Sequence, residues 1–218
     1  MIPRPYIAKW KDQVAWKSDA QVEQDLIISR ALVEIFSDDF LRENLAFRGG
    51  TALYKLYLNP APRYSEDIDL VQIKEGPIKP ILQRIGEKIA FFDEPRVVKP
   101  KANNNTILYR FSSEAAPAQR LKLKIEINCR EHFNILGWNY IPFEVNSDWF
   151  SGKCEITTYY LDELLGTKLR ALYQRKKGRD LFDLFYACQH ADLNLDRIIH
   201  CYREYMKFVV SKPPTLKE

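Results

Sequence analysis

One segment, residues 121–128, alternates apolar and polar side chains without a break, and it constrains the fold more than any other feature of the chain. Its apolar members are Leu121, Leu123, Ile125 and Ile127, and its polar members are Lys122, Lys124, Glu126 and Asn128. Successive side chains of a β-strand point to opposite faces, so the segment is predicted to be a strand with one apolar and one polar face. A sheet with a covered side is therefore expected.

The order of the remaining periodic segments indicates the fold class. Further strands are predicted at residues 45–47, 67–73, 97–98 and 106–111. Helices are predicted at residues 19–37, 51–58, 80–91, 160–177, 180–190 and 194–208. Strands dominate the first two-thirds of the chain and helices the last third, which predicts an α+β fold: a small mixed β-sheet flanked by helices, followed by a small C-terminal helical domain.

These patterns also predict where the domains begin and end. We expect an α+β domain with an N-terminal helix at residues 1–150, a helical domain at residues 151–210, and a loose tail at residues 211–218. Within the first domain, residues 1–18 are expected to form an irregular arm that exposes Trp10 and Trp16.

Composition excludes several classes of protein. Hydrophobic residues make up 46% and aromatic residues 13% of the 218 residues, which argues against a disordered chain. A formal net charge of +4 permits a nucleic-acid partner without requiring one. No segment approaches the roughly 20 apolar residues that cross a bilayer, and no signal-peptide pattern is visible, so a cytoplasmic protein without a membrane partner is expected.

The cysteines give no sign of a metal or disulfide framework. Cys129, Cys154, Cys188 and Cys201 are scattered, without a CxxC spacing. A zinc site is therefore not expected. Scattered thiols of this kind indicate a protein that resides in a reducing compartment.

Two aspartates in one predicted strand carry the first chemical signal. Asp67 and Asp69 are two residues apart, so their carboxylates project from the same face and repel each other unless a cation lies between them. If the strand of Glu126 is a neighbour, three carboxylates converge, which suits one or two Mg²⁺ ions. The alternative is a pair of solvent-facing side chains, although aspartate is a poor strand former.

A glycine pair precedes these aspartates. Gly49-Gly50-Thr51 lies between a predicted strand and a predicted helix, where glycines let a ligand approach the backbone and the helix N-terminus offers N–H groups to a phosphate. Thr51 adds a hydroxyl, and Lys55, one turn later, could reach the same anion. Such a turn alone is usually only a tight turn. Followed by Asp-x-Asp on the next strand, it predicts a triphosphate-binding loop beside a metal site.

The helical third carries further charged candidates. Lys168 falls on the apolar stripe of its helix, where it either extends to the rim or meets a phosphate. Asp183, in the segment Arg179-Asp180-x-x-Asp183, could serve the site or simply form salt bridges along the helix. A basic run is either a solvated face or a surface for RNA phosphates; it comprises Arg170, Arg175, Lys176, Lys177 and Arg179. His190 and His200 are not expected to be catalytic.

Several of these motifs, in this order, resemble a known family. Residues 47–55, Phe-Arg-Gly-Gly-Thr-Ala-Leu-Tyr-Lys, and residues 63–70, Arg-Tyr-Ser-Glu-Asp-Ile-Asp-Leu, look like the signature of the abortive-infection toxin nucleotidyltransferases of the AbiEii/AbiGii type. That family belongs to the DNA-polymerase-β-like nucleotidyltransferase superfamily. The resemblance extends to residues 22–26, 124–128, 163–172 and 179–184.

The resemblance implies a nucleotidyltransferase core and a reaction. With Mg²⁺, the enzyme would transfer NMP from a nucleoside triphosphate (NTP) to an acceptor hydroxyl, at the 3′ end of a tRNA or on a protein, and release pyrophosphate. The biological role would be that of the toxin in a bacterial toxin–antitoxin or phage-defence system, with a separately encoded antitoxin.

The resemblance also implies a role for each matching residue. Gly49, Gly50 and Thr51 would hold the nucleotide phosphates, with Ser65 nearby. Asp67 and Asp69 would be catalytic and hold the metal, with Glu126 as a third metal ligand. Lys168 would contact the triphosphate, and Asp183 would complete the catalytic set.

Two alternative functions use the same parts. One is a non-catalytic module that binds a nucleotide, RNA or a protein, and the other is kinase-like transfer of the γ-phosphoryl group. The presence of both aspartates, the glycine pair and the lysine argues against the first alternative. The second stays open, as do the identity of the NTP, the acceptor and the oligomeric state.

Overall fold

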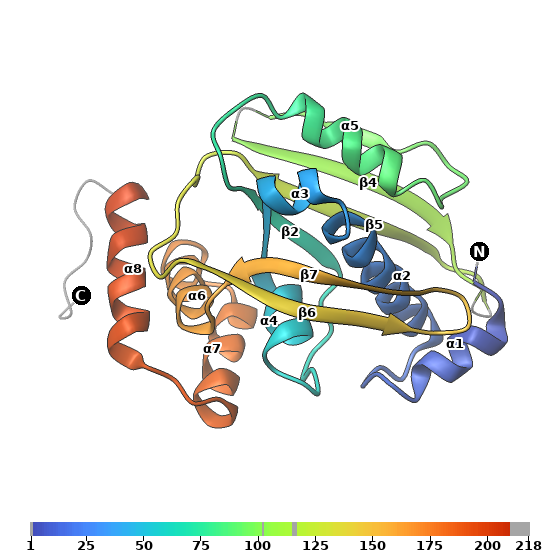
Figure 1. Cartoon of the computed structure of the whole chain (residues 1–218). Coiled ribbons are helices and arrows are strands. Elements are labelled where there is room, and N and C mark those ends of the chain that lie inside the picture. The colour runs from blue at the N-terminus through green and yellow to red at the C-terminus, as the bar shows by residue number, and fades with distance from the viewer. Residues whose placement is uncertain (1, 102, 115–116, 210–218) are drawn as a thin grey trace. The chain divides into compact units, whose positions relative to one another are not determined.

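The computed structural model describes residues 2–101, 103–114 and 117–209, and this part of the chain contains one seven-stranded mixed sheet and eight helices (Figure 1). The strands are β1 (Leu45–Arg48), β2 (Asp67–Gln72), β3 (Val97–Lys99), β4 (Asn104–Ser112), β5 (Arg120–Asn128), β6 (Trp138–Asn146) and β7 (Ser151–Tyr159). Their order in the sheet is β3-β4-β5-β2-β1-β7-β6. The predicted α+β class with a mixed sheet is confirmed.

Of the helices in the described ranges, three precede β1, two lie between β1 and β3, and three follow β7. They are α1 (Arg4–Lys11), α2 (Asp19–Phe36), α3 (Asp39–Asn44), α4 (Gly49–Leu56), α5 (Lys79–Lys88), α6 (Leu161–Arg175), α7 (Gly178–His190) and α8 (Leu195–Val209). No helix in the described ranges is long and apolar enough to cross a membrane.

The chain divides into two compact units. The first comprises Met1–Phe133 and Tyr140–Thr158, and the second comprises Asn134–Asn139 and Tyr159–Glu218. The boundary expected at residue 150 falls just before β7, whereas nearly all of β7 belongs to the first unit, where Thr158 pairs with Phe47 of β1. The tail expected at residues 211–218 lies outside the described residues.

The first unit is built on the alternating strand that the sequence predicts. In β5, Leu123, Ile125 and Ile127 are buried, and they share one core with Ile68 of β2. Helix α2 covers this apolar face, because most of its side chains are buried in the same core. The opposite face of β2 and β5 carries the predicted carboxylates, with the buried Val71 at the far end of the same side of β2.

Three regions of the first unit differ from the sequence-based expectation. The N-terminal arm is not irregular: it contains α1, and Trp10 is buried while Trp16 is half-buried. The reason is a long-range contact, since both indoles donate a hydrogen bond to the Asp25 carboxylate of α2. Strands β6 and β7 and the short helix α3 were not predicted; β6 lies at the edge of the sheet, contains Pro142 and fully buries only Val145.

The second unit consists of α6, α7, α8 and the short segment before β6. The Glu163 carboxylate of α6 accepts hydrogen bonds from the backbone N–H groups of Ile135 and Leu136, at 2.8 and 2.9 Å, and from the Tyr205 hydroxyl at 2.7 Å. Gly166 lets α6 and α8 pack closely, because a Cβ at this position would lie 2.7 Å from the Cβ of Cys201. The helical C-terminal region predicted from periodicity is present.

Candidate active site

The glycine pair makes the turn from β1 into α4. Gly49 has a φ of +84°, a backbone conformation that side-chain-bearing residues rarely adopt. A Cβ added to Gly49 would lie 2.2 Å from Oδ2 of Asp69. Glycine is therefore required here because the backbone turns and passes directly against a carboxylate of the Asp-x-Asp motif.

Thr51 fastens this turn to the next strand. Its hydroxyl donates a hydrogen bond to the backbone carbonyl of Asp67 at 2.6 Å, and its Oγ1 lies 2.9 Å from Oγ of Ser65. A hydroxyl has one proton, so Ser65 is the donor in the second contact. The structure thus brings together the N-terminus of α4, the two hydroxyls and the start of β2, as the sequence motifs predict.

The carboxylates lie on neighbouring strands. β2 and β5 pair in parallel, with Asp69 opposite Glu126 and Asp67 opposite Lys124, so these four side chains share one face of the sheet. The adjacency on which the prediction of Glu126 depended is therefore present. The sequence did not suggest that Lys124, two residues before Glu126 on the same strand, would belong to the same group.

The ammonium of Lys124 lies between two carboxylates. Its Nζ is 3.3 Å from Oδ2 of Asp67 and 3.1 Å from Oε2 of Glu126. Burial opposes the charged form, but the hydrogen bond to Glu126 and the charge of Asp67 outweigh it, so the pKa of Lys124 lies above its ordinary value. The site therefore attracts a cation, and here a side chain of the chain itself supplies the charge.

This observation bears on the predicted metal. Within the described part of the chain, no three histidine, cysteine, aspartate or glutamate side chains converge as a metal-binding group. The oxygen donors of Asp67, Asp69 and Glu126 are nevertheless of the type that Mg²⁺ prefers, and an ammonium occupies a cation position between two of them. The residues fit a divalent ion by their chemistry and charge.

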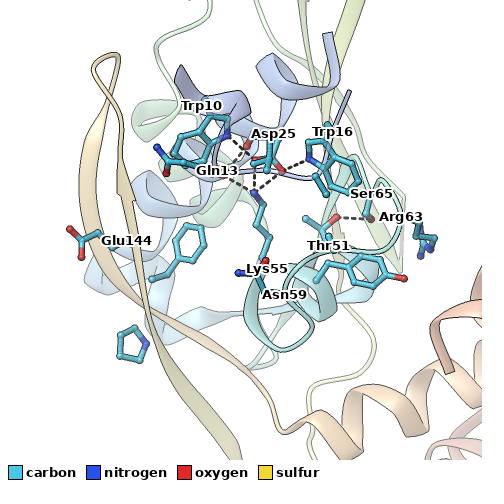
Figure 2. A pocket seen from close by; sticks show the side chains of 17 residues that line it. Trp10, Gln13, Trp16, Asp25, Thr51, Lys55, Asn59, Arg63, Ser65 and Glu144 are labelled. Atoms are coloured by element: carbon cyan, nitrogen blue, oxygen red, sulfur yellow. Dashed lines mark hydrogen bonds and ion pairs between the residues drawn. The ribbon is translucent and has the colours of Figure 1, made fainter. Parts of the chain in front are cut away.

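Lys55 makes contacts that the sequence did not predict. Its ammonium donates to Oδ1 and Oδ2 of Asp25 and to Oγ of Ser29, each at 2.8 Å (Figure 2). Asp25 lies within residues 22–26, a segment of the family resemblance to which the sequence assigned no role. The contact of Lys55 with a phosphate stays a prediction.

Three predicted nucleotide-binding residues open onto one pocket. Thr51, Lys55 and Ser65 line a cavity of about 300 Å³ in the first unit, together with Trp10 and Trp16 of the N-terminal arm. Figure 2 shows the two indoles on either side of Asp25. The fold therefore joins the N-terminal arm, which was not expected to be functional, to the residues of the glycine loop.

The remaining candidates, Lys168 and Asp183, meet each other in the second unit. Nζ of Lys168 lies 2.7 Å from Oδ2 of Asp183 and 3.4 Å from Oδ1 of Asp180. Burial would raise the pKa of the Asp180 carboxyl, but hydrogen bonds from Arg175 and the charge of Lys168 hold it below its ordinary value. The role of Lys168 and Asp183 toward a nucleotide stays a prediction, and the central place of Asp180 was missed.

The basic run of the second unit is only partly a surface patch. Arg175, Lys176, Lys177 and Arg179 are exposed, whereas Arg170 is buried with its guanidinium 5.1 Å from the ring centre of Tyr205. His190 is exposed and stacks on Tyr186.

Comparisons with known proteins agree with these motifs. Residues 30–218 match the family model described as "Nucleotidyl transferase AbiEii toxin, Type IV TA system". The fold is similar to that of MenT4, a nucleotidyltransferase toxin from Mycobacterium tuberculosis H37Rv, with 16% identity, a TM-score of 0.69, and coverage of 99% of this chain and 74% of that one. It is also similar to JHP933 from Helicobacter pylori, with 22% identity, a TM-score of 0.61, and coverage of 87% and 75%. A search of curated proteins gives no match. The chain belongs to the AbiEii family of nucleotidyltransferase toxins of type IV toxin–antitoxin systems.

Proposed function

We propose that this nucleotidyltransferase transfers NMP from an NTP to an acceptor hydroxyl in a reaction that requires Mg²⁺. The observation that carries the proposal is the contact between the glycine turn and the Asp-x-Asp motif, where a Cβ on Gly49 would lie 2.2 Å from the Asp69 carboxylate. Phosphoryl chemistry needs hydrogen-bond donors that hold the phosphates and metal-binding carboxylates side by side. Here one backbone turn provides that adjacency.

The chain's own groups bind and orient the triphosphate. The backbone N–H groups at the start of α4, around Gly49 and Gly50, lie at the positive end of the helix and would donate to the phosphates. The hydroxyls of Thr51 and Ser65 lie 2.9 Å apart and add donors to the same region. In this proposal these groups hold the phosphates in place while the acceptor hydroxyl approaches.

Asp67 and Asp69 would hold the divalent ion, with Glu126 as an additional ligand from β5. When bound, Mg²⁺ neutralises charge on the phosphates and lowers the pKa of the attacking hydroxyl. Lys124 keeps the carboxylates compensated in the absence of the ion, since it bridges Asp67 and Glu126. Because these side chains are about one-third exposed, their ion pairs are weak enough to be exchanged.

The acceptor in this proposal is an RNA hydroxyl, such as the 3′ end of a tRNA, in preference to a protein. The exposed side chains of Arg175, Lys176, Lys177 and Arg179 support this choice, because such a cluster attracts RNA phosphates. Family membership supports the role of a toxin that is paired with an antitoxin.

A labelling experiment tests the reaction. Pure protein is incubated with Mg²⁺, total tRNA and each of four α-³²P-labelled NTPs, beside an Asp67→Asn/Asp69→Asn variant and a control Asp192→Asn variant with an exposed carboxylate changed. We expect label in RNA with the wild type and the control, and none with the double variant. Label in protein instead of RNA would show that the acceptor is a protein. Transfer of label from γ-labelled ATP alone would show that the enzyme transfers a phosphoryl group and not NMP.

A further inference from the structure

The pocket beside the glycine loop has aromatic walls that come from three separate segments. Trp10 and Trp16 belong to the N-terminal arm, Tyr54 to α4 and Phe143 to β6, and all of them line the same cavity of about 300 Å³. A cavity of this volume lies at the lower end of the range for small-molecule sites. All four rings lie in the first unit.

The polar ends of the two indoles are already in use. Nε1 of Trp10 and Nε1 of Trp16 each donate to a different oxygen of Asp25, at 3.0 Å (Figure 2). An indole has only this one donor, so what remains for a ligand is the flat π surface of the ring. Asp25 therefore fixes both rings in place and occupies their only hydrogen-bond donors.

The charge of Lys55 in the pocket is also compensated. Lys55 has three N–H donors, and the structure gives it three acceptors, two on Asp25 and one on Ser29. The ion pair with Asp25 is only slightly exposed to solvent and cancels the charge of the ammonium. The part of the pocket around Lys55 therefore does not favour a phosphate, whereas the aromatic rings favour a neutral planar group.

The rim of the pocket adds two other kinds of group. The amides of Gln13 and Asn59 are exposed at the lining and can both donate and accept hydrogen bonds, as the edge of a nucleobase requires. Thr51 and Ser65 also line the pocket, and they are the hydroxyls assigned above to the phosphates. One molecule with a phosphate chain at these hydroxyls and a planar ring beyond them would satisfy both regions.

We infer that this pocket holds the base and ribose of the bound nucleotide, with Trp10, Trp16, Tyr54 and Phe143 as the stacking surface and Gln13 and Asn59 as the groups that contact the edge of the base. The inference rests on the proposed function and adds the place of the nucleoside. It makes the N-terminal arm part of the substrate site and gives Asp25 the role of a positioning residue.

A pair of matched alanine substitutions tests the inference. Ala15 lines the pocket, and Ala8, in the same N-terminal segment and also exposed, does not. Calorimetry with each NTP and Mg²⁺ is compared with calorimetry of inorganic triphosphate, which has no base. We expect Ala15→Phe to weaken NTP binding about tenfold, to leave triphosphate binding unchanged, and Ala8→Phe to change neither.

A second variant keeps the test usable if Ala15→Phe does not fold. Phe143→Leu retains an apolar side chain but removes a ring, and it is expected to weaken NTP binding severalfold without affecting triphosphate binding. Gln13→Ala and Asn59→Ala are expected to change the order of affinities among the four NTPs. Circular dichroism of each variant confirms its fold.

The outcomes separate this inference from the proposed function. If the wild type binds neither NTP nor triphosphate, the proposed function fails. If the wild type binds NTP and both pocket variants bind it equally well, the pocket does not hold the nucleoside and the inference is overturned. If they bind NTP normally but lose transfer to RNA, the inference is likewise overturned and the pocket belongs to the acceptor.

Discussion

The protein contains two clusters of lysine and carboxylate that differ chiefly in their access to water. In the first unit, Lys124 bridges Asp67 and Glu126, and the three side chains are 27–30% exposed. In the second unit, Lys168 contacts Asp180 and Asp183, and here the lysine is 9% exposed and both aspartates are fully buried. Each cluster joins one lysine to two acids, yet only the first stays in contact with solvent.

The difference in solvent exposure determines how much it costs to exchange or remove a charge in each cluster. Ion pairs at a surface contribute roughly 0–1 kcal/mol each, so in the proposed reaction a metal ion would replace the ammonium at little cost. Removal of one partner from a buried pair leaves a charge without compensation and costs several kcal/mol. A cluster that must exchange cations belongs where water can reach it, and a cluster that holds two helices together does not.

The largest effect is expected for Lys168→Met, which keeps the stem of the side chain and removes its charge. The free energy of unfolding should fall by about 3–5 kcal/mol, because Asp183 and Asp180 stay buried with less compensation. Urea denaturation followed by circular dichroism measures the change. A loss below about 1 kcal/mol would mean that the buried cluster is not what stabilises this unit.

The next effect concerns the two glycines with similar backbone angles, one in each unit. Gly49 has a φ of +84° and contacts Asp69, whereas Gly137 has a φ of +88° and nothing within 4 Å of an added Cβ. Gly137→Ala should cost about 1–2 kcal/mol of unfolding free energy from backbone strain alone. Gly49→Ala should cost about 2–4 kcal/mol and abolish transfer, because Asp69 must move. Equal losses in both variants would argue against the close approach.

A smaller effect is expected from acid. Because the pKa of Asp180 in the folded protein lies below its ordinary value, the unfolded chain binds the proton first as the pH falls. The stabilisation from this carboxylate should be fully present above about pH 4 and should be lost below it. Urea titrations at decreasing pH should show a weaker acid dependence for Asp180→Asn than for the wild type, with Asp192→Asn as the control.

The smallest change in stability is expected for Lys124→Met, the counterpart of Lys168→Met in the exposed cluster. The free energy of unfolding should change by less than about 1 kcal/mol. If the ammonium competes with Mg²⁺ for Asp67 and Glu126, as the proposed function requires, the variant should reach half-maximal transfer at a lower Mg²⁺ concentration. A Mg²⁺ requirement that stays the same or rises would show that Lys124 is not a competitor for the metal.

The parts of the fold that follow a regular period could be predicted from the sequence. The alternation at residues 121–128 predicted β5 and its apolar face, and the spacing of apolar residues predicted α2 and the three C-terminal helices. The edge strand β6 was not recognised, because Pro142 lies within it and, of its alternating residues Ile141, Phe143 and Val145, only Val145 is fully buried. Helix α1 was missed because its burial depends on a contact with α2.

The candidate site divides in the same manner. The Gly-Gly-Thr turn and the Asp-x-Asp strand were visible as local motifs, and the structure brings them together through Thr51 and Gly49. Asp25 and Lys124 were not identified. Their importance comes from partners 30 and 57 residues away in the chain, Lys55 and Asp67.

The sequence by itself determined the α+β class, the family, and which carboxylates share one side of a strand, because the direction of a side chain follows from the local period of the backbone. Only the tertiary structure decided which charges are buried and which partner each one has. Lys55, Lys124 and Lys168 look alike in the sequence, yet one holds Asp25 beside a pocket, one bridges exposed carboxylates, and one is buried against Asp183. Burial and ion pairing arise from packing between distant segments, which no local pattern contains.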